Sequence, residues 1–176
     1  MTVQVQRRLL LTLALCATAA PRASEGGPSA AIGRRAPPFR LPDSDGRPHD
    51  LAEVVRTHRV TVVNFWATWC APCLKELPEF DAVLKSLAGQ RVALLAVNAM
   101  ESEEKVRAFA RKQQFGFPLL VDSEGVAVGD YVGYSAGLPA TFLIDARGIV
   151  RQRVLGPLDG AALKSRIQAL LGAASR

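Results

Sequence analysis

An apolar run that ends at two cysteines constrains this chain more than any other feature. Residues 60–66 are dense in β-branched and aromatic side chains, which is typical of a buried strand. Cys70 and Cys73 follow, and apolar residues then recur every three or four positions up to Gly89, as on one face of a helix. The pattern predicts a strand, a short turn and a helix over residues 71–88. Cys70 would lie directly at the N-terminus of this helix.

This position favours thiol chemistry at the two cysteines. A helix N-terminus presents unpaired N–H groups and a partial positive charge, which favour a thiolate over a thiol. Cysteines in Cys-X-X-Cys sites can have pKa values well below the free value of about 8.5. Pro72 suits the first helical turn, where its missing N–H is not needed. Because this turn brings the two sulfurs within bonding distance, we predict a dithiol that opens and closes as a disulfide.

A zinc site and a purely structural disulfide are the alternatives for the same pair. Zinc would need two further Cys or His ligands at suitable spacing. His49 and His58 both lie upstream, and no cysteine lies downstream. The order strand, Cys-X-X-Cys, helix is the context that the redox interpretation requires. We therefore expect a redox pair, with no bound metal and no cofactor.

Residues 1–19 have the features of a signal peptide. A pair of arginines precedes an apolar stretch, and Ala17-Thr18-Ala19 fits a cleavage site. The apolar stretch is too short to span a membrane, although an uncleaved N-terminal anchor and lipidation at Cys16 are alternatives. Cleavage would leave Cys70 and Cys73 as the only cysteines, in a compartment where disulfides form. We predict an exported, periplasmic protein.

Composition indicates one globular domain. Nearly half of the 176 residues are apolar, which is enough for a hydrophobic core. The net charge is +6, but the basic residues are scattered, so we expect no nucleic-acid partner. Residues 20–36 are rich in Pro, Gly, Ser and Ala and are predicted to form a flexible tether. Residues 37–172 form the predicted domain.

Strand and helix patterns alternate along this domain. Pro78 falls inside the second predicted helix and should kink it. The predicted order gives an α/β domain, a mixed β-sheet flanked by helices, with an N-terminal hairpin. The expected strands are 39–41, 47–50, 60–66, 91–97, 117–121, 140–144 and 149–155, and the expected helices are 51–57, 71–88, 102–110, 126–131 and 158–171.

Three stretches resemble a known family. They are Ala36-Pro37-Pro38-Phe39, the run from Val62 to Cys73 that contains Trp66-Ala67-Thr68-Trp69, and Gly137-Leu138-Pro139-Ala140-Thr141-Phe142. With these landmarks the chain resembles the thioredoxin-fold family, and within it the exported TlpA/ResA-like thiol-disulfide oxidoreductases. That group includes reductases of cytochrome c maturation. The resemblance covers residues 32–172 and implies a thioredoxin-like sheet.

The resemblance also implies a substrate-binding edge. Pro139 is expected to be a cis-proline that packs beside the disulfide and turns the backbone of Leu138 toward an extended substrate. Trp69, Ala71 and Pro72 surround the cysteines and are expected to contact the same substrate, with Trp69 shielding the disulfide.

Glu101 falls where the ResA-like branch is expected to carry an acid close to the cysteines. The resemblance therefore implies that Glu101 steers proton transfer, while an ordinary solvated acid near a helix start is the alternative. Asn64 stands where cytosolic thioredoxins carry a buried aspartate. Deprotonation of Cys73 would then fall to Glu101 or to water.

These features predict an enzyme that reduces protein disulfides. Cys70 would attack a substrate disulfide, Cys73 would resolve the mixed disulfide, and a membrane thiol donor would restore the dithiol. Apocytochrome c is one protein substrate that the resemblance suggests. One alternative is a metallochaperone that holds Cu(I) on the two thiolates. Another is a peroxiredoxin-like peroxidase, which needs a threonine three residues before the reactive cysteine, where this chain has Ala67.

Overall fold

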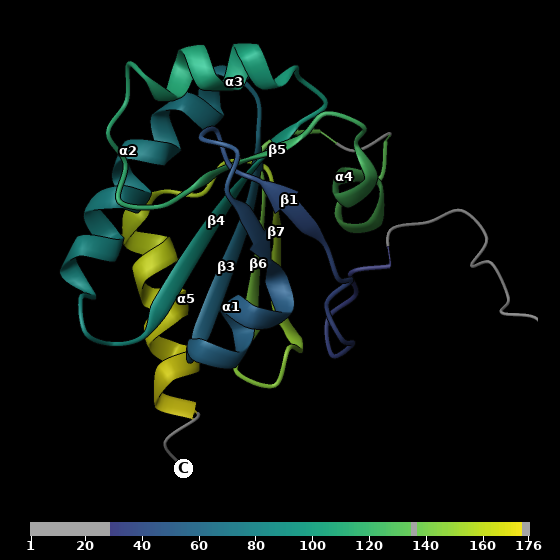
Figure 1. Ribbon diagram of the computed structural model, residues 1–176. Helices are drawn as coiled ribbons and strands as arrows, with labels where there is room; N and C mark the ends of the chain where they lie inside the picture. Colours follow the sequence, from purple (N-terminus) through teal and green to yellow (C-terminus); the bar gives the residue numbers. More distant parts are fainter. Residues whose placement is uncertain (1–28, 135–136, 174–176) are drawn as a thin grey trace, which may run out of the picture.

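A mixed sheet of five strands forms the centre of the computed structural model, which describes residues 29–134 and 137–173 (Figure 1). Its strand order is β5-β4-β3-β6-β7, in which β3, β4 and β5 run parallel and β6 and β7 run antiparallel to their neighbours. The strands are β3 (Val60–Trp66), β4 (Val92–Ala99), β5 (Leu119–Asp122), β6 (Ala140–Asp145) and β7 (Val150–Leu155). The predicted mixed sheet is confirmed.

The central strand β3 is buried along its whole length. Because side chains alternate along a strand, Val60 and Val62 enter the core on one face of the sheet. Val63 and Phe65 enter a second core on the opposite face. A strand covered on both faces reads as a continuous apolar run, which is why the sequence pattern identified it.

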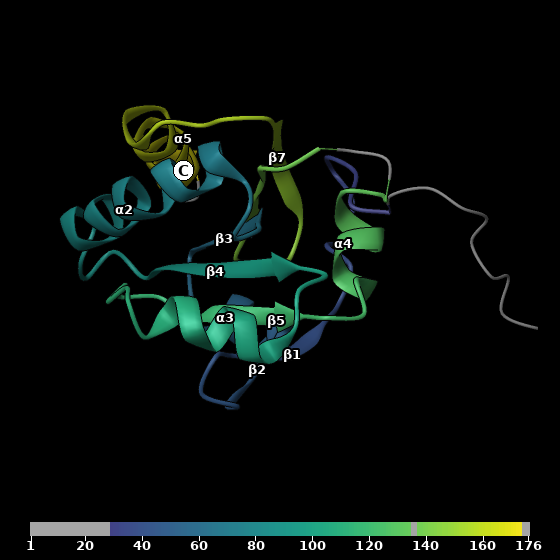
Figure 2. The same ribbon diagram turned by 90° about the horizontal axis from the view of Figure 1, so that it is seen from above.

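Helices cover both faces of the sheet. One face carries α2 (Ala71–Ser86), α3 (Glu103–Ala110) and α5 (Gly160–Ala173), and α2 packs along α5 (Figures 1 and 2). The other face carries α1 (Leu51–Thr57) and α4 (Val126–Tyr131). Pro78 lies within α2, and the helix continues on both sides of it.

The topology brings distant parts of the chain to one edge of the sheet, here called the catalytic edge. The parallel strands β3, β4 and β5 all end there, and α2 begins there directly after β3. The antiparallel strand β6 starts at this edge, with Ala140 opposite Phe65. Cys70, Glu101 and Pro139 adjoin these strand ends and are therefore gathered at the catalytic edge.

The N-terminal part of the domain is more ordered than its composition indicates. The predicted hairpin is present as β1 (Arg40–Pro42) and β2 (Pro48–Asp50), and it lies against β5. Upstream of it, the backbone N–H groups of Ser29 and Ala30 donate to the Asp130 carbonyl at 2.7 and 3.1 Å, and Ala30 is fully buried. The packed domain thus includes residue 29 rather than beginning at residue 37. Backbone hydrogen bonds hold this segment, so its side-chain composition could not reveal them.

The predicted signal peptide and most of the predicted tether lie outside the described residues. Within the part of the chain that the structure describes, no helix is long and apolar enough to cross a membrane.

Candidate active site

Cys70 occupies the N-cap of α2 and is joined to Cys73 by a disulfide with an S–S distance of 2.01 Å. The backbone N–H of Cys73 donates to the Cys70 sulfur at 3.4 Å. The extended backbone of Cys70 ends the turn after β3, and Pro72 occupies the first helical turn, as predicted. Both cysteines are buried, with 4 % of the surface of Cys70 and 1 % of that of Cys73 exposed.

The two tryptophans of the motif lie in opposite environments. Trp66 is fully buried, and its ring packs on Phe109 with the ring centroids 4.8 Å apart. Trp69 has 68 % of its surface exposed. Trp66 therefore belongs to the core, whereas Trp69, one residue before Cys70, presents an aromatic surface to solvent.

The peptide bond between Leu138 and Pro139 is cis, as the resemblance implied. The carbonyl of Pro139 accepts a hydrogen bond from the N–H of Gly156 at 2.9 Å, which ties this turn to the end of β7. Leu138 is half-buried and packs against both hydrophobic cores. The turn therefore has a firmly placed backbone at the catalytic edge.

Glu76 is a buried acid that the sequence analysis missed. It lies one turn after Cys73 on the buried face of α2, and its Oε1 accepts a hydrogen bond from the Leu158 N–H at 2.5 Å. Burial raises the pKa of Glu76 to about 7, although the hydrogen bond from Leu158 and the nearby Asn64 amide act in the opposite direction. The other carboxylate oxygen, Oε2, has no hydrogen-bond partner among the described residues.

An acid with these properties can exchange a proton near neutral pH. The signal available in the sequence was its position, because a charged residue falls on a helix face otherwise occupied by Leu77 and Phe80. Asn64, which is fully buried on β3, donates from Nδ2 to the Thr141 hydroxyl at 3.1 Å. Glu76 thus supplies a buried carboxyl on α2, beside an asparagine on β3.

Glu101 is also buried, but it has several hydrogen-bond donors and its pKa is shifted in the opposite direction to that of Glu76. Its two carboxylate oxygens accept hydrogen bonds from the Thr68 N–H at 2.7 Å, the Thr68 hydroxyl at 2.6 Å and the Asn98 amide at 2.8 Å. Lys105 forms an ion pair with it at 2.6 Å. Burial alone would raise its pKa, but these partners outweigh burial and lower the pKa to about 2.

Glu101 is therefore ionised throughout the neutral range. Its partner Thr68 lies two residues before Cys70, so the carboxylate anchors the turn between β3 and α2. A carboxylate this acidic is a poor proton acceptor at neutral pH. Its geometry supports a positioning role at this turn, and it makes Glu76 the stronger candidate for proton transfer.

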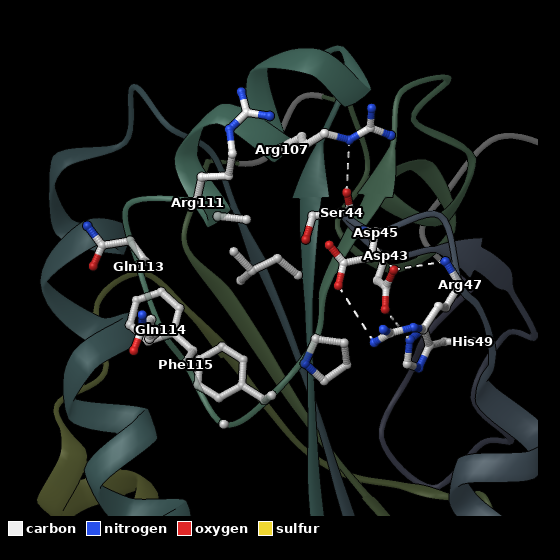
Figure 3. Close-up of a pocket in the computed structure, with 15 residues that line it drawn as sticks. Asp43, Ser44, Asp45, Arg47, His49, Arg107, Arg111, Gln113, Gln114 and Phe115 are labelled. Carbon is white, nitrogen blue, oxygen red and sulfur yellow. Dashed lines mark hydrogen bonds and ion pairs between the residues drawn. The ribbon is translucent and has the colours of Figure 1, made fainter.

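One hollow of the described surface lies away from the disulfide. A cavity of about 510 Å³ opens between the β1–β2 hairpin and the segment that leads from α3 into β5, with Arg111, Phe115 and Asp43 on its walls (Figure 3). It adjoins Leu119 at the start of β5, whereas the catalytic edge adjoins the strand's end.

The two histidines considered as zinc ligands have other partners. His49 contacts Asp43 at 2.9 Å, and His58 contacts the Val54 carbonyl at 2.9 Å. Within residues 29–134 and 137–173, no group of three or more His, Cys, Asp or Glu side chains is arranged to hold a metal ion.

Known proteins share this sequence pattern and this fold. A family model described as the AhpC/TSA family matches residues 32–153. The thiol-disulfide oxidoreductase ResA of Geobacillus thermodenitrificans is 33 % identical over 141 residues, which are 80 % of this chain and 78 % of that protein. The chain belongs to the AhpC/TSA family. With its disulfide at the start of α2, it is a thiol-disulfide oxidoreductase of the ResA type.

Solved structures agree with this assignment. A thioredoxin-family thiol:disulfide interchange protein from Chlorobium tepidum superposes with a TM-score of 0.69 at 29 % identity, covering 81 % of this chain and 99 % of that one. The peroxidoxin BcpB of Mycobacterium tuberculosis superposes with a TM-score of 0.68 at 26 % identity, covering 81 % and 96 %. The thioredoxin-like fold is thereby confirmed.

Replacement of Glu76 should change how stability depends on pH. The folded protein holds the Glu76 proton more tightly than the unfolded chain, so folding loses free energy as pH rises from about 4.5 to about 7. We expect Glu76→Gln to gain about 2 to 3 kcal/mol relative to the wild type between pH 4 and pH 8. Urea denaturation of the oxidised proteins measures this, with the exposed Glu124→Gln as control. A constant difference between wild type and Glu76→Gln would contradict the assignment.

Replacement of Glu101 should have the opposite pH dependence. The ionised carboxylate stabilises the fold above pH 4.5, and this contribution disappears as the pH falls toward 2. At pH 7, Glu101→Gln turns one acceptor into an amide donor that faces other donors, so we expect a loss of about 1 to 3 kcal/mol. Denaturation at pH 7 and pH 3 should show a loss that shrinks in acid. Equal stability of the two proteins at pH 7 would contradict the anchoring role.

Proposed function

We propose that this oxidoreductase is exported and reduces disulfides of other proteins through the Cys70–Cys73 pair. The observation that carries this proposal is the pairing of a disulfide at the start of α2 with the buried acid Glu76 one turn below it. The helix start stabilises the thiolate of Cys70, and Glu76 offers a proton acceptor on the side of Cys73.

The first step joins enzyme and substrate. The Cys70 thiolate attacks one sulfur of the substrate disulfide, a new S–S bond forms between the two proteins, and the other substrate sulfur leaves as a thiolate that takes a proton from water. Cys70 is the N-cap of α2, where the helix start favours a thiolate, whereas Cys73 lies inside the helix, and this supports Cys70 as the attacking residue. The exposed ring of Trp69, the first helical residues Ala71 and Pro72, and the Leu138 backbone would line the approach of the substrate.

The second step releases the substrate. Cys73 loses its proton to Glu76, directly or through water, and its thiolate attacks the Cys70 sulfur. The bond between Cys70 and the substrate breaks, and the substrate sulfur leaves as a thiolate that takes up the proton held by Glu76. The substrate leaves with two thiols, and the enzyme disulfide is restored. The substrate gains two electrons and the enzyme loses them, so a dithiol donor must reduce the enzyme before another cycle. Pro139 would hold the substrate backbone in register, and Glu101 would hold the turn that carries Cys70.

A reducing direction is supported by the residues between the cysteines. Ala71 and Pro72 include no histidine, which would stabilise the Cys70 thiolate strongly and make the pair a strong oxidant. The expected signal peptide would place the protein in the periplasm, where a membrane thiol donor would supply electrons. Apocytochrome c is the proposed substrate, because the TlpA/ResA-like oxidoreductases that the sequence resembles include reductases of cytochrome c maturation.

Peroxide reduction is a second function that one comparison favours, because BcpB is called a peroxidoxin and shares the fold. Ala67 stands three residues before Cys70, where peroxidase chemistry needs a threonine hydroxyl, and Thr68 instead donates its hydroxyl to Glu101. Disulfide reduction is therefore the stronger proposal.

Replacement of each cysteine should cause a different defect in disulfide reduction. We expect Cys70→Ser to abolish reduction of insulin disulfides, because the attacking thiolate is lost. Cys73→Ser should still attack but should accumulate a mixed disulfide with substrate, visible by non-reducing electrophoresis and mass spectrometry. Consumption of hydrogen peroxide by the same proteins provides the comparison with peroxidase activity. A Cys70→Ser protein that reduces insulin at the wild-type rate would overturn the mechanism.

A further inference from the structure

Three large apolar side chains are exposed near the catalytic edge and have no part in the steps described above. Met100, Val126 and Tyr134 have 56 %, 60 % and 70 % of their surface exposed. Met100 directly follows β4, while Val126 and Tyr134 lie at the start of α4 and just beyond its end. These three residues are here called the Met100 surface. Exposed apolar side chains that gather in one place are characteristic of interaction sites, whereas isolated ones need no explanation.

Two glycines of the α4 region leave the space that the side chains of Met100 and Tyr134 occupy. A Cβ atom at Gly125 would lie 2.8 Å from Cγ and 3.1 Å from Sδ of Met100, and 3.5 Å from Cε1 of Tyr134. A Cβ atom at Gly129 would lie 2.7 Å from the Tyr134 hydroxyl oxygen and 2.8 Å from Cζ. The Met100 thioether and the edge of the Tyr134 ring therefore both lie against the bare backbone of Gly125, and the rest of the ring lies against Gly129.

The backbone of Met100 is strained, which also points to a use for this side chain. Its φ is +60°, in the left-handed region that a non-glycine residue rarely adopts. Its N–H donates to the Asp122 carbonyl at 3.0 Å, which fixes the turn after β4. Burial of the side chain cannot be the reason for a methionine here, because more than half of it is exposed. Such strain is characteristic of functional sites.

The Met100 surface continues toward the disulfide. Met100 precedes Glu101, whose Oε2 accepts the hydrogen bond from the Thr68 N–H at 2.7 Å. Thr68 precedes the exposed Trp69, which precedes Cys70. The buried carboxylate thus fastens the turn that carries Met100 to the turn that carries Trp69, and the two exposed side chains flank this junction.

A groove of about 380 Å³ adjoins the Met100 surface at Val126. It runs between α4 and β1, where Pro38, Phe39 and Leu41 form an apolar wall. Charged residues also line the groove, namely Arg40, Glu103, Asp122 and Glu124. A hollow of this size accommodates a bulky side chain. The catalytic edge therefore offers apolar contacts well beyond the two sulfurs.

We propose that the Met100 surface binds the segment of a substrate protein that flanks its disulfide, and that it selects segments with a bulky apolar side chain. This inference rests on the proposed function, because a polypeptide held at Cys70 would lay its neighbouring residues over Trp69 and then over Met100. The occupant is an extended polypeptide, whose backbone can pass the disulfide while one side chain enters the groove. A small disulfide such as oxidised glutathione carries no such segment.

The test uses pairs of peptide disulfides that differ at a single position, where one peptide has Phe and the other has Ser. This position is moved through the three residues before and the three residues after the attacked cysteine. We expect wild type to favour one Phe peptide by about tenfold in kcat/KM, mainly through KM. The double variant Met100→Gly/Tyr134→Ala should lose this preference while keeping its kcat/KM for oxidised glutathione. Glycine suits the left-handed backbone at position 100, so this change does not strain the fold. Ile32→Ala is the matched control, because Ile32 is also exposed but precedes Gly33, which is hydrogen-bonded to Val150 at the end of β7 away from the catalytic edge.

The variant Gly129→Ala tests the proposal independently. Its new methyl group would displace the Tyr134 ring without removing it, so the preference for the Phe peptide should fall. A wild type that treats all the peptides alike, or a double variant that retains the preference, would overturn the proposal. Sedimentation that shows self-association of wild type but not of the variant would assign the surface to a second copy and would also overturn it. Wild type that reduces neither the peptides nor oxidised glutathione would instead refute the proposed function itself.

Discussion

The burial of β3 on both faces of the sheet is the constraint on which the site depends. Because both cores close around this strand, its end is fixed, and the turn after it delivers Cys70 to the start of α2. The parallel strands beside it end at the same edge, and the antiparallel β6 begins there. The fold therefore needs no long loop to gather the disulfide, Glu101 and Pro139.

Two buried carboxyl groups near this edge show how environment separates chemical roles. Glu101 faces donors on every side and remains ionised, so it can organise a turn but cannot readily accept a proton. Glu76 has one strong donor and an unpartnered oxygen, so burial dominates and its pKa rises to about 7. The contrast between these two groups assigns anchoring to one and proton exchange to the other.

Much of this arrangement could be predicted from the sequence, because it depends on local patterns. The buried strand, the helix start at Cys70 and the cis bond before Pro139 were all predicted and are all present. Glu76 was missed because its burial depends on Leu158, which lies 82 residues away along the chain. The order of residues 29–36 was missed for a related reason, since their partners are backbone groups of residues such as Asp130 and Val150.

The reduction potential of the Cys70–Cys73 pair tests the central claim most directly. Equilibration with glutathione or dithiothreitol buffers, followed by quantification of the free thiols, gives this value. A reductase that needs a dedicated thiol donor should have a potential at or below roughly −200 mV, in the range of thioredoxin and the glutaredoxins. A potential near roughly −120 mV would place the pair among strong oxidants and would contradict the assigned direction.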